Sequence, residues 1–99
     1  MKYTGTLQET VLETQRRILG NKHPYTLTSM GNLAWTYGQL GRMKDAATLQ
    51  ETVLEAHQRI LGNEHLHTLT SMSNLAWIYG HLDRTKDAVT LQETVLEAR

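Results

Sequence analysis

TLQETVLE, at residues 6–13, is an octapeptide that occurs three times in this chain and decides its fold. The second and third copies begin at Thr48 and Thr90, so both spacings are 42 residues. A fixed period between about 20 and 50 residues is typical of proteins built from stacked structural repeats. Each repeat in such a protein buries its apolar surface against the next one, and no single deep core is needed. The repeated octapeptide therefore predicts a solenoid.

Each 42-residue period contains two patterns that are typical of amphipathic helices. The second pattern runs from about Met43 to Leu61 and contains the octapeptide. No segment sustains the alternation of polar and apolar residues that marks a strand, so we expect an all-α fold. The first pattern runs from about Tyr25 to Leu40, and its apolar residues recur at helical spacing: Leu27, Met30, Leu33, Ala34, Tyr37 and Leu40.

The residues between the patterns predict where the helices end. Pro24 suits the first turn of a helix, where its missing N–H has no partner to lose. Gly41 suits the tight turn between paired helices. In the second copy Leu66 replaces Pro24 and Asp83 replaces Gly41. A side chain in left-handed backbone costs on the order of 1 kcal/mol relative to glycine, so we expect the second turn to be looser.

Composition excludes several classes of function. The 99 residues are enough for one domain, and the formal net charge is zero. Proteins that bind nucleic acid usually carry a basic stripe, which is missing here. No apolar run approaches the roughly 20 residues that cross a bilayer, so we expect no membrane partner. The absence of cysteine excludes disulfides and favours a reducing, cytoplasmic location.

Neither metal binding nor catalysis is indicated. His65 and His67, beside Glu64, are the closest histidine cluster, but zinc requires four converging ligands and no cysteine assists. The serines lie within helical patterns, without a glycine elbow or a positioned histidine–aspartate pair. The Glu-Thr pairs of the octapeptides, such as Glu9-Thr10, are interpreted as solvated surface. We therefore expect no metal, no cofactor and no enzyme activity.

The layout resembles that of tetratricopeptide repeats, and the similarity covers residues 6–99. A right-handed helical solenoid with a concave binding face is what the resemblance implies, together with a non-catalytic role in protein–protein interaction. The 42-residue length and the stretch LGNKHPYTLTSMGNLAW (residues 19–35) are similar to the long subtype found in kinesin light chains. They are more similar still to the repeat arrays of NACHT or NB-ARC (NLR-like) sensor proteins. The resemblance rests on Asn32-Leu33-Ala34, Tyr37, Gly41 and Ala46, and on Asn74-Leu75-Ala76, Tyr79 and Ala88.

The chain starts in the middle of a repeat. If the two helices of a repeat are named A and B, the expected order is B-A-B-A-B, or about two and a half repeats. We expect a single domain over 1–99, composed of a half repeat (1–22), a full repeat (23–64) and a full repeat truncated at its end (65–99). Neither end has the polar capping helix that such stacks require.

Uncapped terminal helices are expected to expose apolar side chains that a neighbour would otherwise cover. Exposed apolar patches of this kind mark association sites, so the chain is predicted to form a homo-oligomer: a dimer, a ring or a filament. The alternative is a monomeric fragment of a longer array. The residues expected on these surfaces are Leu7, Val11 and Ile18 at one end and Leu91, Val95 and Leu96 at the other.

A second function remains open, in which the chain is a monomeric module that binds a peptide or protein along the A helices. The resemblance implies that Asn32 and Asn74 face this groove and bond to a peptide backbone; alternatively, they bond to a neighbouring helix or to water. Trp35 and Trp77 share the face and either pack over small residues of the adjacent A helix or anchor a ligand side chain. The predicted groove residues are Asn32, Asn74, Trp35, Trp77, Gln39 and His81.

Overall fold

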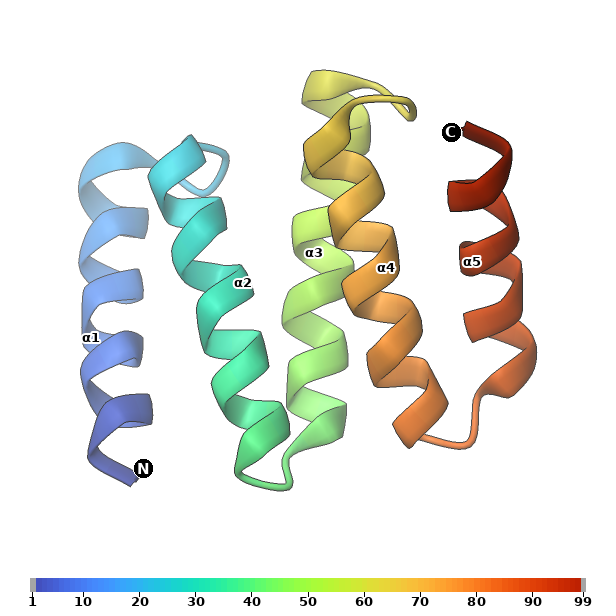
Figure 1. Cartoon of the computed structure of the whole chain (residues 1–99). Coiled ribbons are helices and arrows are strands. Elements are labelled where there is room, and N and C mark those ends of the chain that lie inside the picture. The colour runs from blue at the N-terminus through green and yellow to red at the C-terminus, as the bar shows by residue number, and fades with distance from the viewer. Residues whose placement is uncertain (1, 99) are drawn as a thin grey trace.

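In the computed structural model the chain is a row of five α-helices, with α1 and α5 at opposite ends (Figure 1). The structure describes residues 2–98, and side chains from residue 5 to residue 98. The all-α prediction is confirmed, and the helices form a right-handed helical solenoid of the tetratricopeptide type. Their bounds are α1 Lys2–Leu19, α2 Pro24–Gln39, α3 Met43–Leu61, α4 Leu66–His81 and α5 Thr85–Ala98.

Each helix packs chiefly on the helices next to it in the sequence. The Cα atoms span 37 × 29 × 15 Å, which describes a flat slab rather than a sphere. The core is therefore distributed along the row, between successive helices, as expected for a stacked repeat. None of the helices in residues 2–98 is long and apolar enough to cross a membrane.

The octapeptide has two apolar sides, and the end helices reveal which neighbour each side meets. In α1, which has only α2 beside it, Leu12 is buried and Val11 is exposed. In α5, which has only α4 beside it, Val95 is buried and Leu96 is exposed. The valine position therefore faces the preceding helix and the leucine position faces the following one. In α3, which has both neighbours, the valine and the leucine are both buried.

Histidine side chains begin the A helices. His23 Nδ1 accepts a hydrogen bond from the Tyr25 backbone N–H at 3.1 Å, and His65 Nδ1 accepts one from the His67 N–H at 3.0 Å. Each bond pairs one of the backbone donors that the first turn of a helix leaves free. Pro24 occupies the first position of α2, as predicted.

The two turns between paired helices differ as predicted. Gly41 has φ +80° and Asp83 has φ +61°. The first turn contains four backbone hydrogen bonds, two from Leu40 and one each from Gly41 and Arg42, whereas the second retains one each from Leu82 and Arg84. The turn at Asp83 is therefore the looser of the two.

Replacing Asp83 with glycine is expected to raise the free energy of unfolding by about 1 kcal/mol, because glycine adopts positive φ without steric cost. The reverse change in the first turn, Gly41→Asp, is expected to lower it by a similar amount. Urea unfolding followed by circular dichroism measures both. Equal stability of Asp83→Gly and the unmodified chain would contradict the assignment of strain to this residue.

Candidate functional site

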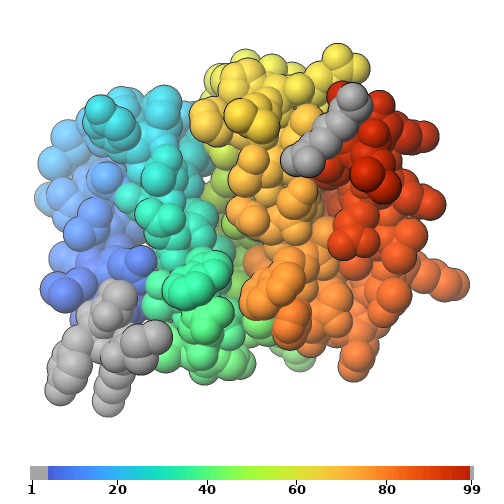
Figure 2. Space-filling view, viewed as in Figure 1, coloured from blue at the N-terminus to red at the C-terminus, as the bar shows by residue number. Residues whose placement is uncertain are grey.

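The broad face formed by α2 and α4 contains a hollow of about 390 Å³ (Figure 2). Side chains from both A helices form its walls, and one residue of α3 lies at its base. Of the predicted groove residues, the structure brings Trp35, Asn74 and Trp77 together here. The lining residues are Gly31, Trp35, Gln50, Ser73, Asn74, Trp77 and Ile78.

Trp77 packs on the neighbouring A helix. A Cβ added to Gly38 of α2 would lie 3.3 Å from Cε of Met43 and 3.7 Å from Cζ3 of Trp77, so the methionine and the indole together occupy the space that the glycine leaves open. On its own helix, the imidazole of His81 lies 4.2 Å from the Trp77 ring, centroid to centroid. Trp77 is 45% exposed, whereas Trp35, which has no A helix on its outer side, is 61% exposed. Trp77 therefore packs on α2, and both indoles keep exposed surface that a ligand side chain can contact.

The two asparagines are not equivalent in the structure. Asn74 borders the hollow, whereas Asn32 is exposed on α2 outside it. The hollow needs an A helix on each side, and no A helix precedes α2 in this chain. Gln39 and His81 also lie outside the lining, although the His81 ring covers one side of Trp77.

Gln50, which sequence reasoning missed, lies at the base of the hollow. It is a buried residue of α3, and among the described residues its amide makes no hydrogen bond. Its amide atoms are not fully enclosed, so they remain accessible from the hollow. The sequence did contain a sign of its importance, because a glutamine stands at this position in all three octapeptides, as Gln8, Gln50 and Gln92.

A repeated polar contact links each B helix to the next A helix. The hydroxyl of Tyr37 donates a hydrogen bond to Glu9, and that of Tyr79 donates one to Glu51. Glu9 is exposed and Glu51 partly exposed, in keeping with the solvated surface expected from the sequence, but each also accepts a hydrogen bond from the helix that follows. Burial, together with the bond to Glu51, raises the pKa of Tyr79 to about 12, and the same causes raise the pKa of Tyr37.

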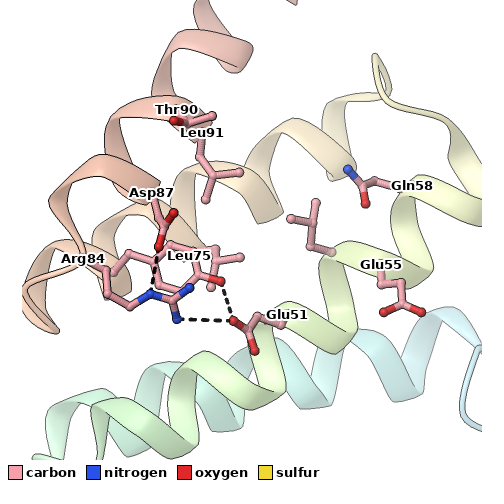
Figure 3. A pocket seen from close by; sticks show the side chains of 10 residues that line it. Glu51, Glu55, Gln58, Leu75, Arg84, Asp87, Thr90 and Leu91 are labelled. Carbon is pink, nitrogen blue, oxygen red and sulfur yellow. Dashed lines mark hydrogen bonds and ion pairs between the residues drawn. The ribbon is translucent and has the colours of Figure 1, made fainter.

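An arginine completes each of these contacts. Arg84 lies over the Tyr79 ring at 3.9 Å. Its guanidinium lies 2.9 Å from Asp87 and 3.7 Å from Glu51 (Figure 3). Arg42 lies over Tyr37 in the same way, at 4.0 Å. These groups border an open hollow of about 380 Å³ between α3, α4 and α5. The arginine and carboxylate groups at this hollow are already paired with one another. We therefore interpret the contact as one that holds the helices together, not as a ligand site.

The end helices expose apolar side chains, with one correction to the prediction. Leu7, at 67% exposed, lies uncovered on α1 with Val11 and Ile18, as expected. On α5, however, Val95 is buried and Leu91 is partly buried, because both face α4. Only Leu96 of the three predicted residues is exposed. Val89 joins it on the uncovered side of α5, a residue that the sequence reasoning did not select.

The histidines of the second repeat form a cluster around His57. His57 Nδ1 and the Ser71 hydroxyl are 2.7 Å apart, and the His57 ring lies 6.0 Å from that of His67. Burial, and then the nearby charges of His67 and His65, lower the pKa of His57. Among residues 5–98, no group of three or more histidine and carboxylate side chains is placed to hold a metal ion.

We expect the chain to lose stability as the pH falls below the ordinary imidazole pKa of about 6.5. The folded state favours neutral His57, so the unfolded chain binds the proton more readily and acid favours unfolding. Replacement by glutamine, which occupies this position in α1 as Gln15, is expected to reduce the loss. Denaturant unfolding at about pH 7.5 and pH 5.5 measures it. An equal acid sensitivity of His57→Gln would assign the effect to other groups.

Comparisons with known proteins agree with this geometry. The family model for the tetratricopeptide repeat matches residues 5–56 and 37–99. The chain is 31% identical to a Podosopora anserina protein described as a putative kinesin light chain with nearly identical TPR-like repeats, with a TM-score of 0.93 over 98% of this chain and 46% of that one. A variant of the same protein with one residue substituted matches equally well.

A more distant structure shares the fold alone. BtubC (BKLC) from P. vanneervenii is 22% identical, with a TM-score of 0.89 over 96% of this chain and 37% of that chain. The present chain thus spans less than half the length of each of these solved structures. No curated protein matches the sequence. The two family-model matches together cover nearly all of the chain, and the chain belongs to the tetratricopeptide-repeat family.

Proposed function

We propose that this chain, a protein–protein interaction scaffold, associates with further copies of itself through its two end helices. The supporting observation is the contrast among the three octapeptides. Leu54 in the middle helix is buried under α4, but Leu96, at the same position in α5, is 73% exposed. The apolar side chains at the two ends of the row therefore match surfaces that a neighbouring helix covers elsewhere in the same molecule.

The charge of the chain also favours association between copies. Ten basic and ten acidic residues give a formal net charge of zero, so copies do not repel one another over long distances. We further propose a cytoplasmic location and a setting like that of the sensor proteins that the repeats resemble; the absence of cysteine supports the location.

Light scattering after size exclusion, over a hundredfold range of concentration, tests the self-association. We expect the mass to rise above the 11.3 kDa of one chain, and Leu96→Glu to abolish the rise. Thr94→Glu is the matched control, because it adds the same charge to α5 at a position that is exposed in α3 as well. A mass of one chain throughout would contradict the proposal.

A second candidate function, peptide binding in the hollow between α2 and α4, is favoured by Gln50. Its unpaired amide, which is accessible from the hollow, and the amide of Asn74 are suited to the N–H and C=O groups of an extended backbone. Trp35 and Trp77 flank these amides and offer aromatic surface to side chains.

Tryptophan fluorescence tests this candidate, because the only two tryptophans of the chain line the hollow. The probe is a mixed library of short peptides, and a binding peptide is expected to change the emission. Asn74→Ala is expected to weaken binding about tenfold, the equivalent of one lost hydrogen bond to a desolvated group. Asn32→Ala is the control and is expected to bind normally. Equal losses in both variants would exclude the hollow as the binding site.

A further inference from the structure

Helices α1 and α5 carry the same octapeptide, but only α1 lies on α2. Helix α1 binds α2 through Leu12, which is 4% exposed, and through Glu9, which accepts the hydrogen bond of Tyr37. The residues at the same positions of α5 are Leu96 and Glu93. Helix α5 therefore carries counterparts of two side chains that hold α1 on α2, and both are exposed.

The octapeptide supplies three glutamates at the acceptor position, but among the described residues only two tyrosines pair with them. Tyr37 is paired with Glu9, and Tyr79 is paired with Glu51. Glu93 is next in the series. It is exposed at the edge of a surface hollow, and within residues 5–98 it takes part in no hydrogen bond or ion pair. This end of the molecule thus has an acceptor in position for one more tyrosine.

The surface around Gly80 of α4, next to α5, is also left uncovered by the described residues. Gly80 of α4 is the counterpart of Gly38 of α2, against which Trp77 packs. A Cβ at Gly80 would meet no described atom within 4 Å, so this surface is free to receive an indole ring. The more exposed of the two indoles is that of Trp35, and Trp35 lies on α2. Helix α2 therefore carries both the tyrosine that matches Glu93 and the tryptophan that matches Gly80.

We propose that α5 of one copy replaces α1 on α2 of the next copy, so that copies join head to tail. Glu93 then accepts the hydrogen bond from Tyr37 of the next copy, and Trp35 of that copy packs against Gly80. The proposal rests on the proposed self-association, but it places the contact between α5 of one copy and α2 of the next, with α1 released from the contact. Because the two surfaces in contact differ, the assembly either closes into a ring or continues as a filament.

Within the octapeptide the exchange replaces like with like, which limits its cost. Outside the octapeptide the two helices differ, and residues 16–19 of α1 have no counterpart on α5. Leu96 becomes buried where Leu12 was, and one glutamate replaces another. Val89 takes the position of Gly5, where a Cβ would make ordinary contacts with Cδ1 of Leu40 at 3.6 Å and Cγ2 of Thr36 at 3.9 Å. The two γ-methyl groups of valine require a further adjustment of these side chains. The indole–glycine contact is gained without the loss of a counterpart.

Hydrogen–deuterium exchange of the unmodified chain tests the proposal directly. Amides of α1 and α5 are compared at a dilute concentration and at one where light scattering detects assembly. Release of α1 is expected to reduce the protection of α1, while α5 gains protection. Protection of both helices would overturn the exchange and leave self-association intact. A mass of one chain at every concentration would overturn both.

Variants at matched positions give effects of opposite sign. Leu12→Ala weakens the hold of α1 on α2 and is expected to lower the concentration for half-assembly by about tenfold. Glu9→Gln acts in the same direction without opening a cavity. Leu96→Glu is expected to abolish assembly, and Leu7→Glu to leave it unchanged, because Leu7 is not covered by α2. Weaker assembly of Leu12→Ala, or loss of assembly in Leu7→Glu, would overturn the exchange.

Discussion

Replacing Leu54 with alanine is expected to lower the free energy of unfolding by about 2 to 5 kcal/mol. Leu54 is buried in the middle of the row, where α4 covers the side of α3 that carries it. Truncation loses the transfer free energy of the side chain and leaves a cavity between two helices that both have neighbours and therefore collapse little. Urea unfolding followed by circular dichroism gives the change.

The octapeptide supplies the control for this prediction. Leu96→Ala removes the same atoms from the same local sequence, and at concentrations where the chain is monomeric we expect it to cost less than about 0.5 kcal/mol. Leu96 is mostly exposed in the single chain, so little burial is lost. Similar costs for Leu54→Ala and Leu96→Ala would mean that α4 does not cover α3 as described.

Ala46→Leu is expected to destabilise the chain by about 1 to 3 kcal/mol, for the opposite reason. Ala46 has no exposed surface and lies where α3 meets the end of the preceding turn. A larger side chain has no room there, so it forces α2 and α3 apart or takes a strained rotamer. The midpoint of urea unfolding should fall with little change in slope.

Ala98→Leu is the matched control, because Ala98 is exposed on the last turn of α5. It is expected to leave stability unchanged within about 0.5 kcal/mol. A stable Ala46→Leu chain would show that the solenoid opens between α2 and α3 more readily than close packing allows.

The candidate sites could be predicted only in part. Trp35, Asn74 and Trp77 were selected because they lie on the A-helix face, and the structure places them around one hollow. Gln50 was missed because it reaches the hollow from the other helix of the repeat, which no pattern within α2 or α4 reveals. The Tyr79–Glu51 pair was missed for a similar reason, since 28 residues separate its members.

The sequence by itself determined the number of helices, their order and their ends. The 42-residue period, the helical spacing of apolar residues and the turn residues are local signals, and local signals fix where a helix begins and stops. Only the tertiary structure decided which side of each helix is buried. Val11 and Val95 lie in identical octapeptides, yet the first is exposed and the second is 7% exposed. Burial depends on which neighbouring helix is present, and an identical sequence cannot encode that difference.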